Sequence, residues 1–152
     1  MAEPTFRSAR SNDLAAIVAL LADDELGATR EDASTPLDPR YTAAFAAVTA
    51  DPNQLLLVAD RGGGVVGCLQ ITFIPGLTRT GMWRGQIEGV RIAREKRAIG
   101  IGREMFGWAI ERCRERDCGL VQLTTDKTRP DAHTFYAALG FGASHEGMRL
   151  NL

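Results

Sequence analysis

The sequence has few of the residues that build metal clusters and covalent crosslinks. Only three cysteines and two histidines occur among its 152 residues. The cysteines, Cys68, Cys113 and Cys118, are odd in number and lack C-x-x-C spacing. This pattern argues against a zinc site or a disulfide framework and for a reducing compartment. We therefore expect no metal site, and we expect the cysteines to be small core residues.

Long apolar runs and an excess of one charge are also missing. No stretch approaches the roughly 20 apolar residues that span a bilayer, and the first ten residues, MAEPTFRSAR, contain no apolar signal-peptide core. Eighteen Lys and Arg against nineteen Asp and Glu give a formal net charge of −1. The overall charge therefore gives no reason to expect nucleic acid or a membrane as a partner. We expect a cytoplasmic protein with a single domain over residues 1–152.

The order of the expected elements indicates an α/β (α+β) fold. Helical spacing of apolar residues predicts helices over 14–26, 41–50, 102–116 and 129–139. Extended, β-rich runs occur at 5–10, 54–60, 65–73, 86–93 and 119–125, and the tail 141–152 can add last strands. The segments 27–40 and 74–84 are expected to be loops. Alternation in 86–93 places Ile87, Gly89 and Arg91 on one face, and Glu88, Val90 and Ile92 on the other.

Residues 96–102, KRAIGIG, lie between an expected strand and an expected helix. Glycines there allow close backbone approach, N–H groups at a helix start bind anions, and Arg97 and Arg103 add charge. The Lys and Ser/Thr of a P-loop are absent. A dinucleotide-binding G-x-G-x-x-G motif would need glycine where Met105 stands, and it would follow a first strand. A nucleotide-binding protein therefore stays only as a less favoured alternative.

The R-x-x-G-x-G segment from Arg97 to Gly102 resembles motif A of the GNAT superfamily of N-acetyltransferases, which binds the pyrophosphate of acetyl-coenzyme A. The stretch AHTFYAALGF at 132–141 is similar to the superfamily's motif B, A-x-x-F-Y-x-x-L-G-F. The resemblance covers nearly the whole chain. It implies a GNAT-type mixed, mostly antiparallel sheet of six to seven strands, flanked by about four helices and splayed at the central parallel pair. One departure is Ala98, where many members have glycine; a methyl group fits there if φ is negative.

The resemblance implies an enzyme that moves the acetyl group of acetyl-coenzyme A directly to a primary amine. Glu88 matches a carboxylate that removes the amine proton, and partial burial would raise its pKa and make it a better base. The alternative for Glu88 is a salt bridge to Arg84 or Arg91. Tyr136 matches the acid that protonates the departing thiolate, and its alternative role is a core aromatic. The implied cofactor-binding residues are Val90, Ile92, Arg97, Ala98, Ile99, Gly100, Ile101, Gly102, Arg103, Arg129 and Tyr136.

A narrower resemblance concerns the acceptor. Residues 129–136, RPDAHTFY, with Ser144-His145 beyond, are similar to the end of the bacterial aminoalkylphosphonate N-acetyltransferases. His133 is accordingly a candidate substrate contact, with a surface or capping histidine as the alternative. Arg79 and Arg84 would suit a carboxylate or phosphonate on the acceptor, although surface arginines are common. We favour a small-molecule amine over a protein or peptide; an acyl-coenzyme A sensor without turnover and a homodimer remain open.

Overall fold

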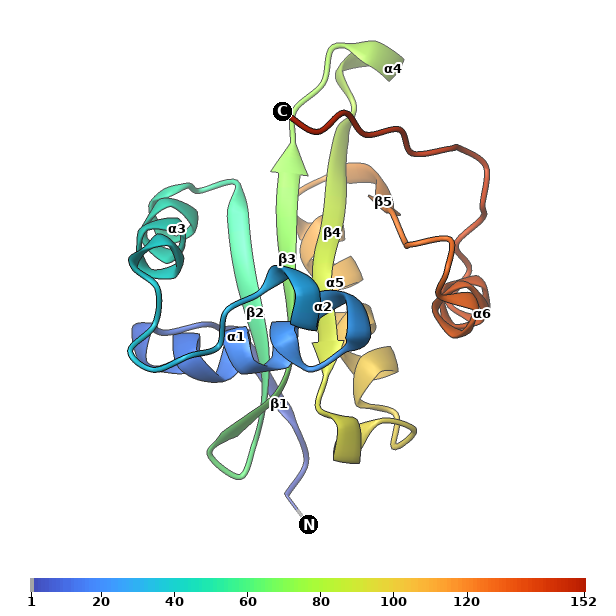
Figure 1. The fold of residues 1–152 in the computed structure, drawn as a ribbon. Coiled ribbons are helices and arrows are strands. Elements are labelled where there is room, and N and C mark those ends of the chain that lie inside the picture. The colour runs from blue at the N-terminus through green and yellow to red at the C-terminus, as the bar shows by residue number, and fades with distance from the viewer. Residues whose placement is uncertain (1) are drawn as a thin grey trace.

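The computed structural model describes residues 2–152 and contains one five-stranded sheet (Figure 1). The strands follow one another across the sheet in chain order. Each of the first four is antiparallel to its neighbours among them, whereas the fifth is parallel to the fourth. A tight turn at Gly62 and Gly63, both with positive φ, joins the predicted hairpin strands. The strands are β1 (Thr5–Ser8), β2 (Gln54–Arg61), β3 (Gly64–Ile74), β4 (Trp83–Ile92) and β5 (Cys118–Leu123).

Helices cover both faces of this sheet. In Figure 1, α1 and α2 cross the front of the sheet and α5 lies behind it. No helix within residues 2–152 is long and apolar enough to cross a membrane. The α-helices are α1 (Leu14–Ala22), α2 (Glu25–Arg30), α3 (Pro39–Ala50), α4 (Thr78–Gly81), α5 (Ile101–Glu115) and α6 (Pro130–Ala138), and the 3-10 turns are η1 (Ser11–Asp13) and η2 (Arg94–Lys96).

The main core lies between the sheet and α5. The apolar stripe predicted on this helix, which includes Met105, Phe106 and Ala109, is fully buried against strand residues such as Leu69 and Ile71. Burying each such side chain contributes about 1.5–3 kcal/mol, so the amphipathic pattern of α5 fixes which face of the helix meets the sheet. A smaller cluster on the opposite face of the sheet packs α1 against β2 and β3.

The cysteines occupy the positions expected of core residues. Cys68 and Cys113 are buried, Cys118 is half-buried, and all three are free thiols. Burial raises the pKa of the Cys68 thiol to about 12 and that of the Cys113 thiol to about 11. Because the thiolate is the reactive form, these two cysteines are inert packing residues.

The predicted first helix and first loop differ from the structure. The helix expected over 14–26 stops at Ala22, and α2 starts anew at Glu25. Asp24 caps this second helix, since its carboxylate accepts a hydrogen bond from the Gly27 amide at 2.5 Å. The expected loop 27–40 therefore contains most of α2 and the start of α3, and α4 lies within the expected loop 74–84.

The tail was wrongly predicted to add strands. Residues 141–152 form none, so the sheet has five strands instead of six to seven. The parallel pair β4–β5 consequently lies at the edge of the sheet, not at its centre. The predicted splay is present, because β4 and β5 pair only as far as Ile87 and Leu123, whereas β4 continues to Ile92. Within residues 2–152, the last residues of β4 therefore have no strand beside them on the β5 side.

A β-bulge in β4 changes which side chains share a face. Cys68 of β3 lies opposite Arg91 and Gln70 lies opposite Glu88, so β4 holds one extra residue there, and Gly89 has φ 63°. The extra residue reverses the alternation beyond it. Val90 and Ile92 pack into the α5 core with Ile87, while Arg91 reaches the α2 side. The strict alternation predicted for 86–93 is therefore wrong after Glu88.

Candidate functional site

A cleft of about 830 Å³ opens where β4 and β5 separate. Its walls come from the end of β4, the η2–α5 loop, the start of α2 and the start of α6. All but two of the predicted cofactor-binding residues line this cleft. The exceptions are Ile99, which is half exposed, and Ile101, whose side chain is buried in the core. The lining residues that were predicted are Val90, Ile92, Arg97, Ala98, Gly100, Gly102, Arg103, Arg129 and Tyr136.

One end of the cleft is suited to an anion. Gly100 precedes α5 with φ 89°, and its carbonyl accepts the Glu104 amide at 3.1 Å. The amides of residues 101–103 belong to the first turn, where N–H groups have no partner within the helix and the helix dipole is positive. Lys96 and Arg103 line the same end. The side chain of Arg97 is held at the rim, because its Nε donates to the Ile92 carbonyl at 3.2 Å.

Ala98 adopts a conformation opposite to the one expected. Its φ is 68°, in the left-handed region, so the condition of a negative φ is not met. An L-residue in this region costs roughly 1–2 kcal/mol relative to right-handed backbone. The loop before α5 therefore keeps the backbone path that glycine would adopt most easily, and the methyl group of Ala98 lines the cleft.

A cluster of three charged side chains, which we call the Asp24 clasp, joins the walls of the cleft. One carboxylate oxygen of Asp24, Oδ2, lies 2.8 Å from Arg129 Nη2 and 3.6 Å from Arg91 Nε. The clasp thus connects the cap of α2, the bulged part of β4 and the residue that precedes α6. Burial alone would raise the pKa of Asp24, but the Gly27 amide and the two guanidinium groups outweigh it and lower that pKa. Asp24 is therefore ionised at neutral pH.

The sequence reasoning did not identify Asp24. Reading 14–26 as one helix placed this residue in the last turn of that helix, where a carboxylate has no evident function. The available signal was local, since aspartate is a preferred N-cap residue and Glu25 places an acidic side chain in the first turn of a new helix. The alternative role considered for Glu88, a salt bridge to Arg91, is not what the structure shows, because Arg91 pairs with Asp24.

Tyr136 lies on the inner side of α6 and lines the cleft. Its ring makes edge contacts with Phe106, Phe135 and Phe141, with centroids 5.4–6.0 Å apart. Burial raises the pKa of the phenol, although the charges of Arg91 and Arg129 oppose this effect. The ring of Tyr136 therefore packs with core aromatics, and the same residue also lines the cleft wall.

Glu88 lies outside this cleft. It is exposed, so the expected partial burial is wrong, and no ion pair within residues 2–152 involves it. It is located just before the bulge, opposite Gln70. Its carboxylate is thus available to solvent or to a ligand on the front face of the sheet.

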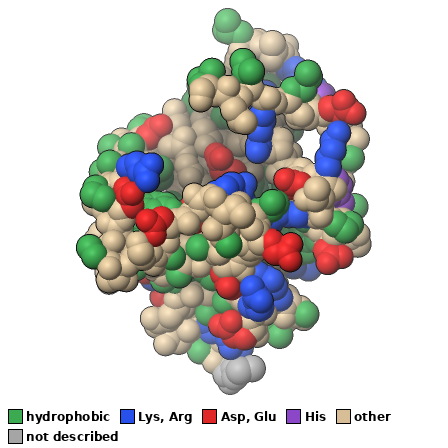
Figure 2. Space-filling model, in the orientation of Figure 1, with side chains coloured by type: hydrophobic (Ala, Val, Ile, Leu, Met, Phe, Trp, Pro, Cys, Tyr) green, Lys and Arg blue, Asp and Glu red, His purple; other side chains and the backbone are tan. Residues whose placement is uncertain are grey.

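Amide side chains form a polar strip on that face. Gln70 Nε2 and Thr72 Oγ1 both donate to Gln54 Oε1, at 2.9 and 3.0 Å, and Gln122 Nε2 donates to Gln86 Oε1 at 2.8 Å. These polar side chains are half-buried, whereas Gln and Thr are mostly exposed in proteins. Figure 2 shows a hollow on this side of the molecule with acidic and basic side chains in it.

The predicted substrate residues are dispersed, and none of them lines the cleft. Arg79 is exposed in α4 with φ 54°, and Arg84 is half-buried in β4. His133 is exposed on α6, where its Nε2 lies 3.3 Å from the Asp126 carbonyl oxygen. The exposure of His133 matches the alternative of a surface histidine.

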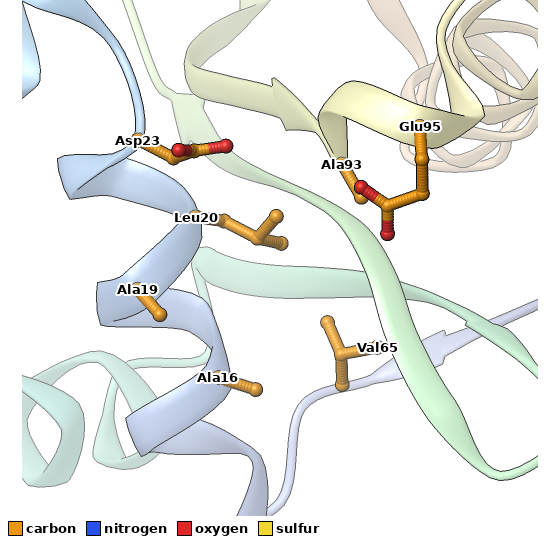
Figure 3. Close-up of a pocket in the computed structure, with 7 residues that line it drawn as sticks. All are labelled: Ala16, Ala19, Leu20, Asp23, Val65, Ala93 and Glu95. Atoms are coloured by element: carbon orange, nitrogen blue, oxygen red, sulfur yellow. The ribbon is translucent and has the colours of Figure 1, made fainter.

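A second hollow of about 380 Å³ lies between α1 and the residues that follow β4. In Figure 3 the carboxylates of Asp23 and Glu95 come from opposite sides of it, above small apolar side chains. Asp23 is paired with Arg94 at 3.5 Å. Neither Glu88 nor Tyr136 lines this hollow, and residues 2–152 contain no cluster of three metal-ligating side chains.

Known proteins support the assignment suggested by the cleft. Residues 16–141 match the acetyltransferase (GNAT) family. The aminoalkylphosphonate N-acetyltransferase of Salmonella typhimurium is 35% identical over 105 residues, which are 69% of this chain and 68% of that protein. A crystal structure from Bacillus halodurans C-125, named as a transcriptional regulator, is 50% identical with a TM-score of 0.96 and covers 99% of this chain and 100% of that one. A putative acetyltransferase from Agrobacterium tumefaciens is 28% identical with a TM-score of 0.86, covering 97% and 99%. The chain therefore belongs to the GNAT family of acetyltransferases, and its family and its curated relative support N-acetyltransferase activity.

Proposed function

We propose that residues 1–152 form a single N-acetyltransferase domain that moves the acetyl group of acetyl-coenzyme A directly to the primary amine of a small molecule. The observation that carries this proposal is the cleft between β4 and α6. Its lining combines the N-terminus of α5 and basic side chains with Tyr136 of α6. A long ligand with phosphates at one end and a reactive thioester at the other suits this arrangement.

Coenzyme A would be held mainly by backbone groups and basic side chains. The amides at the start of α5 would bind the pyrophosphate, and Lys96, Arg97 and Arg103 would add charge. Backbone groups of β4 beyond Ile87, which lack a strand on the β5 side, would pair with the amides of the pantetheine arm. Arg129 would add positive charge at the opposite wall of the cleft, where the Asp24 clasp holds its side chain.

The chemistry needs one base and one acid. Glu88 would accept the amine proton through water, which lets the nitrogen attack the thioester carbonyl carbon. The new C–N bond forms as the C–S bond breaks, and Tyr136 would donate its proton to the leaving thiolate sulfur. The raised pKa of Tyr136 keeps this proton in place at neutral pH. Exposure of Glu88 on the front face suits a base that works through water.

The acceptor would bind on the polar strip at the front of the sheet. Arg84 precedes Glu88 by four residues on β4 (88 − 84), so the unbulged part of the strand places both on the same face. The positive charge of Arg84 would suit an anionic group on a small molecule, and the carboxylate of Glu88 would suit the amine of the same molecule. The Salmonella relative acts, by its name, on an aminoalkylphosphonate, which is such a molecule.

A binding comparison followed by a turnover assay tests this function. Acetyl-coenzyme A should raise the melting temperature, whereas NAD and ATP should not. Release of free thiol should then depend on added aminoalkylphosphonates or related small amines. Binding without turnover on any amine would indicate a sensor, a role that the name of the Bacillus structure would suit. Turnover on peptides alone would indicate a protein acetyltransferase. We also propose a cytoplasmic location, where acetyl-coenzyme A and free thiols coexist.

A further inference from the structure

Arg91 places a largely buried positive charge in the wall of the cleft. Its side chain is 13% exposed, and its Nη1 donates to the Val90 carbonyl at 2.8 Å. Within residues 2–152 its Nε is buried without a hydrogen-bond partner, although Asp24 Oδ2 lies 3.6 Å away. Burying a guanidinium group is costly unless negative charge compensates for it. A guanidinium in this position therefore suits a cleft in which negative charge develops.

The Asp24 clasp carries a net positive charge. One carboxylate, that of Asp24, is shared by Arg91 and Arg129, so the three side chains sum to +1 (2 − 1). All three are largely buried. Charges in such positions are screened by water and salt less than surface charges are, and they act over several ångströms. The clasp is therefore a fixed source of positive potential beside the cleft.

Tyr136 lies within reach of this potential. It follows Arg129 by seven residues (136 − 129), which is about two helical turns, and both side chains line the cleft. Burial raises the pKa of the Tyr136 phenol, and the charges of Arg91 and Arg129 lower it. Within the described part of the chain, no hydrogen bond to the phenol contributes. The protein therefore acts on the charge of this phenol through the two arginines.

The other charged groups of the cleft are less well placed to act on Tyr136. The elements packed against its ring, α5 and the start of the tail, present Phe106 and Phe141 to it. Two further carboxylates in the cleft wall are exposed, so water screens them; these are Glu25 and Asp131. Three further cations belong to the η2–α5 loop and the start of α5, namely Lys96, Arg97 and Arg103.

We propose that Arg91, together with Arg129, stabilises the phenolate that Tyr136 becomes when it gives its proton to the leaving coenzyme A sulfur. This role rests on the proposed function, in which Tyr136 is the acid. As the C–S bond breaks, the proton of the phenol moves to the sulfur, so the thiol leaves neutral and the negative charge passes to the phenol oxygen. Solvent returns a proton to that oxygen after the product has left.

The charge of the clasp offsets the cost of this step. A phenolate surrounded by phenylalanine rings would be poorly solvated, and burial alone would make Tyr136 a weaker acid. The nearby guanidinium groups favour the ionised phenol and so ease the transfer of its proton. Arg91 acts only through Tyr136 in this scheme and is a positioning residue for its charge.

Fluorine NMR measures the influence of Arg91 on Tyr136 without turnover. The chain has two tyrosines, Tyr41 and Tyr136, so labelling with 3,5-difluorotyrosine, which titrates at lower pH than tyrosine, marks two positions, and Tyr41→Phe assigns them. Arg91→Gln should raise the pKa of the label at position 136, whereas Arg91→Lys, which keeps the charge, should leave it nearly unchanged. Tyr41 is an internal reference, because it lies on α3 outside the cleft.

Arg94→Gln is the matched control. It removes the same charge three residues along the chain, but the Arg94 side chain is 68% exposed and does not line the cleft. The pKa at position 136 should therefore stay as in the natural chain. Asp24 remains paired with Arg129 at 2.8 Å when Arg91 is replaced, so we expect Arg91→Gln to fold. If it does not fold, Arg129→Gln makes the same NMR test.

Steady-state kinetics show whether the charge serves the reaction. Arg91→Gln should lower kcat about three- to tenfold, which is less than the loss of about a hundredfold expected for Tyr136→Phe, because the phenol remains. The KM for the amine should change little. In the Tyr136→Phe background, Arg91→Gln should have almost no further effect on kcat, since the group on which it acts is gone.

The possible outcomes separate this role from the proposed function. If Tyr136→Phe slows the reaction but Arg91→Gln leaves the pKa at position 136 unchanged, only the role of Arg91 is overturned. Equal losses of kcat from Arg91→Gln in the natural and Tyr136→Phe backgrounds would also overturn it. A raised KM for an anionic amine with unchanged kcat would replace it by direct contact between Arg91 and the acceptor. A natural rate for Tyr136→Phe would instead remove the acid from the proposed function, and the role of Arg91 with it.

Discussion

Removing the charge of Asp24 should separate the walls of the cleft. Asparagine still caps a helix about as well as aspartate, so Asp24→Asn keeps the cap of α2 and removes only the carboxylate shared by Arg91 and Arg129. Losing one partner of a buried pair costs 3–5 kcal/mol, whereas an exposed pair is worth about 0–1 kcal/mol. The exposed fractions of Asp24, Arg91 and Arg129, 19%, 13% and 31%, lie between these cases.

We therefore expect Asp24→Asn to lower the free energy of unfolding by about 2 kcal/mol. For a chain of this length that loss lowers the melting temperature by about 4–8 °C. The two arginines would then repel each other across the cleft, so the KM for acetyl-coenzyme A should also rise. Thermal and urea unfolding measure the first effect, and initial rates at varied acetyl-coenzyme A measure the second.

The neighbouring carboxylate provides the control. Asp23 pairs with Arg94 at 3.5 Å, and their side chains are 47% and 68% exposed. Asp23→Asn should therefore change stability by less than about 0.5 kcal/mol. If Asp23→Asn and Asp24→Asn lower the melting temperature equally, the clasp is no more than another surface ion pair and the reasoning is refuted.

The pH dependence gives a second test of the clasp. The pKa of Asp24 is lower in the folded state than its ordinary value, so its contribution is fully present above the unfolded pKa of about 4. The contribution is lost as the pH falls through the folded pKa. The stability difference between the natural protein and Asp24→Asn should thus be constant from pH 8 to 5 and shrink below about pH 4.

Three further substitutions separate binding from chemistry. Gly102→Ala should leave the free energy of unfolding unchanged or slightly higher, because alanine favours a helix by up to about 1 kcal/mol and its Cβ would lie 3.4 Å from Phe135 Cζ. The affinity for acetyl-coenzyme A measured by calorimetry should nevertheless fall, since the added methyl group would stand where the phosphate must approach. Tyr136→Phe keeps the ring and should lower kcat about a hundredfold with little change in the KM for acetyl-coenzyme A, so a natural rate would remove the phenol from the mechanism. Glu88→Gln should lower kcat at neutral pH with partial recovery at high pH, and unchanged kinetics across the pH range would exclude Glu88 as the base.

Elements with strong local signals were predictable from the sequence. The stripe on α5 has a helical period and appears as the buried face of that helix. The glycine turn before β3 and the glycine at the start of α5 both have the positive φ that explains their residue type. Local chemistry decides these features, since a turn or a helix start depends on a few neighbouring residues.

Features that depend on distant contacts were not predictable. The bulge at Gly89 is a mismatch between two strands, so only the pairing of β3 with β4 reveals it. Asp24 becomes a site residue because β4 and α6 bring Arg91 and Arg129 to it from far along the chain. The exposure of Glu88 likewise depends on which helices leave the front of the sheet uncovered.

The sequence by itself determined the family and the position of the glycine loop before α5, and it supplied the residues that we propose as acid and base. These are short patterns whose meaning lies in neighbouring residues and in spacing along the chain. The tertiary structure alone decided that β4 and β5 separate after Ile87, that Asp24 links the walls of the resulting cleft, and that the tail finds no place in its own sheet. Each of these depends on how strands and helices distant in sequence share space, which no local pattern encodes.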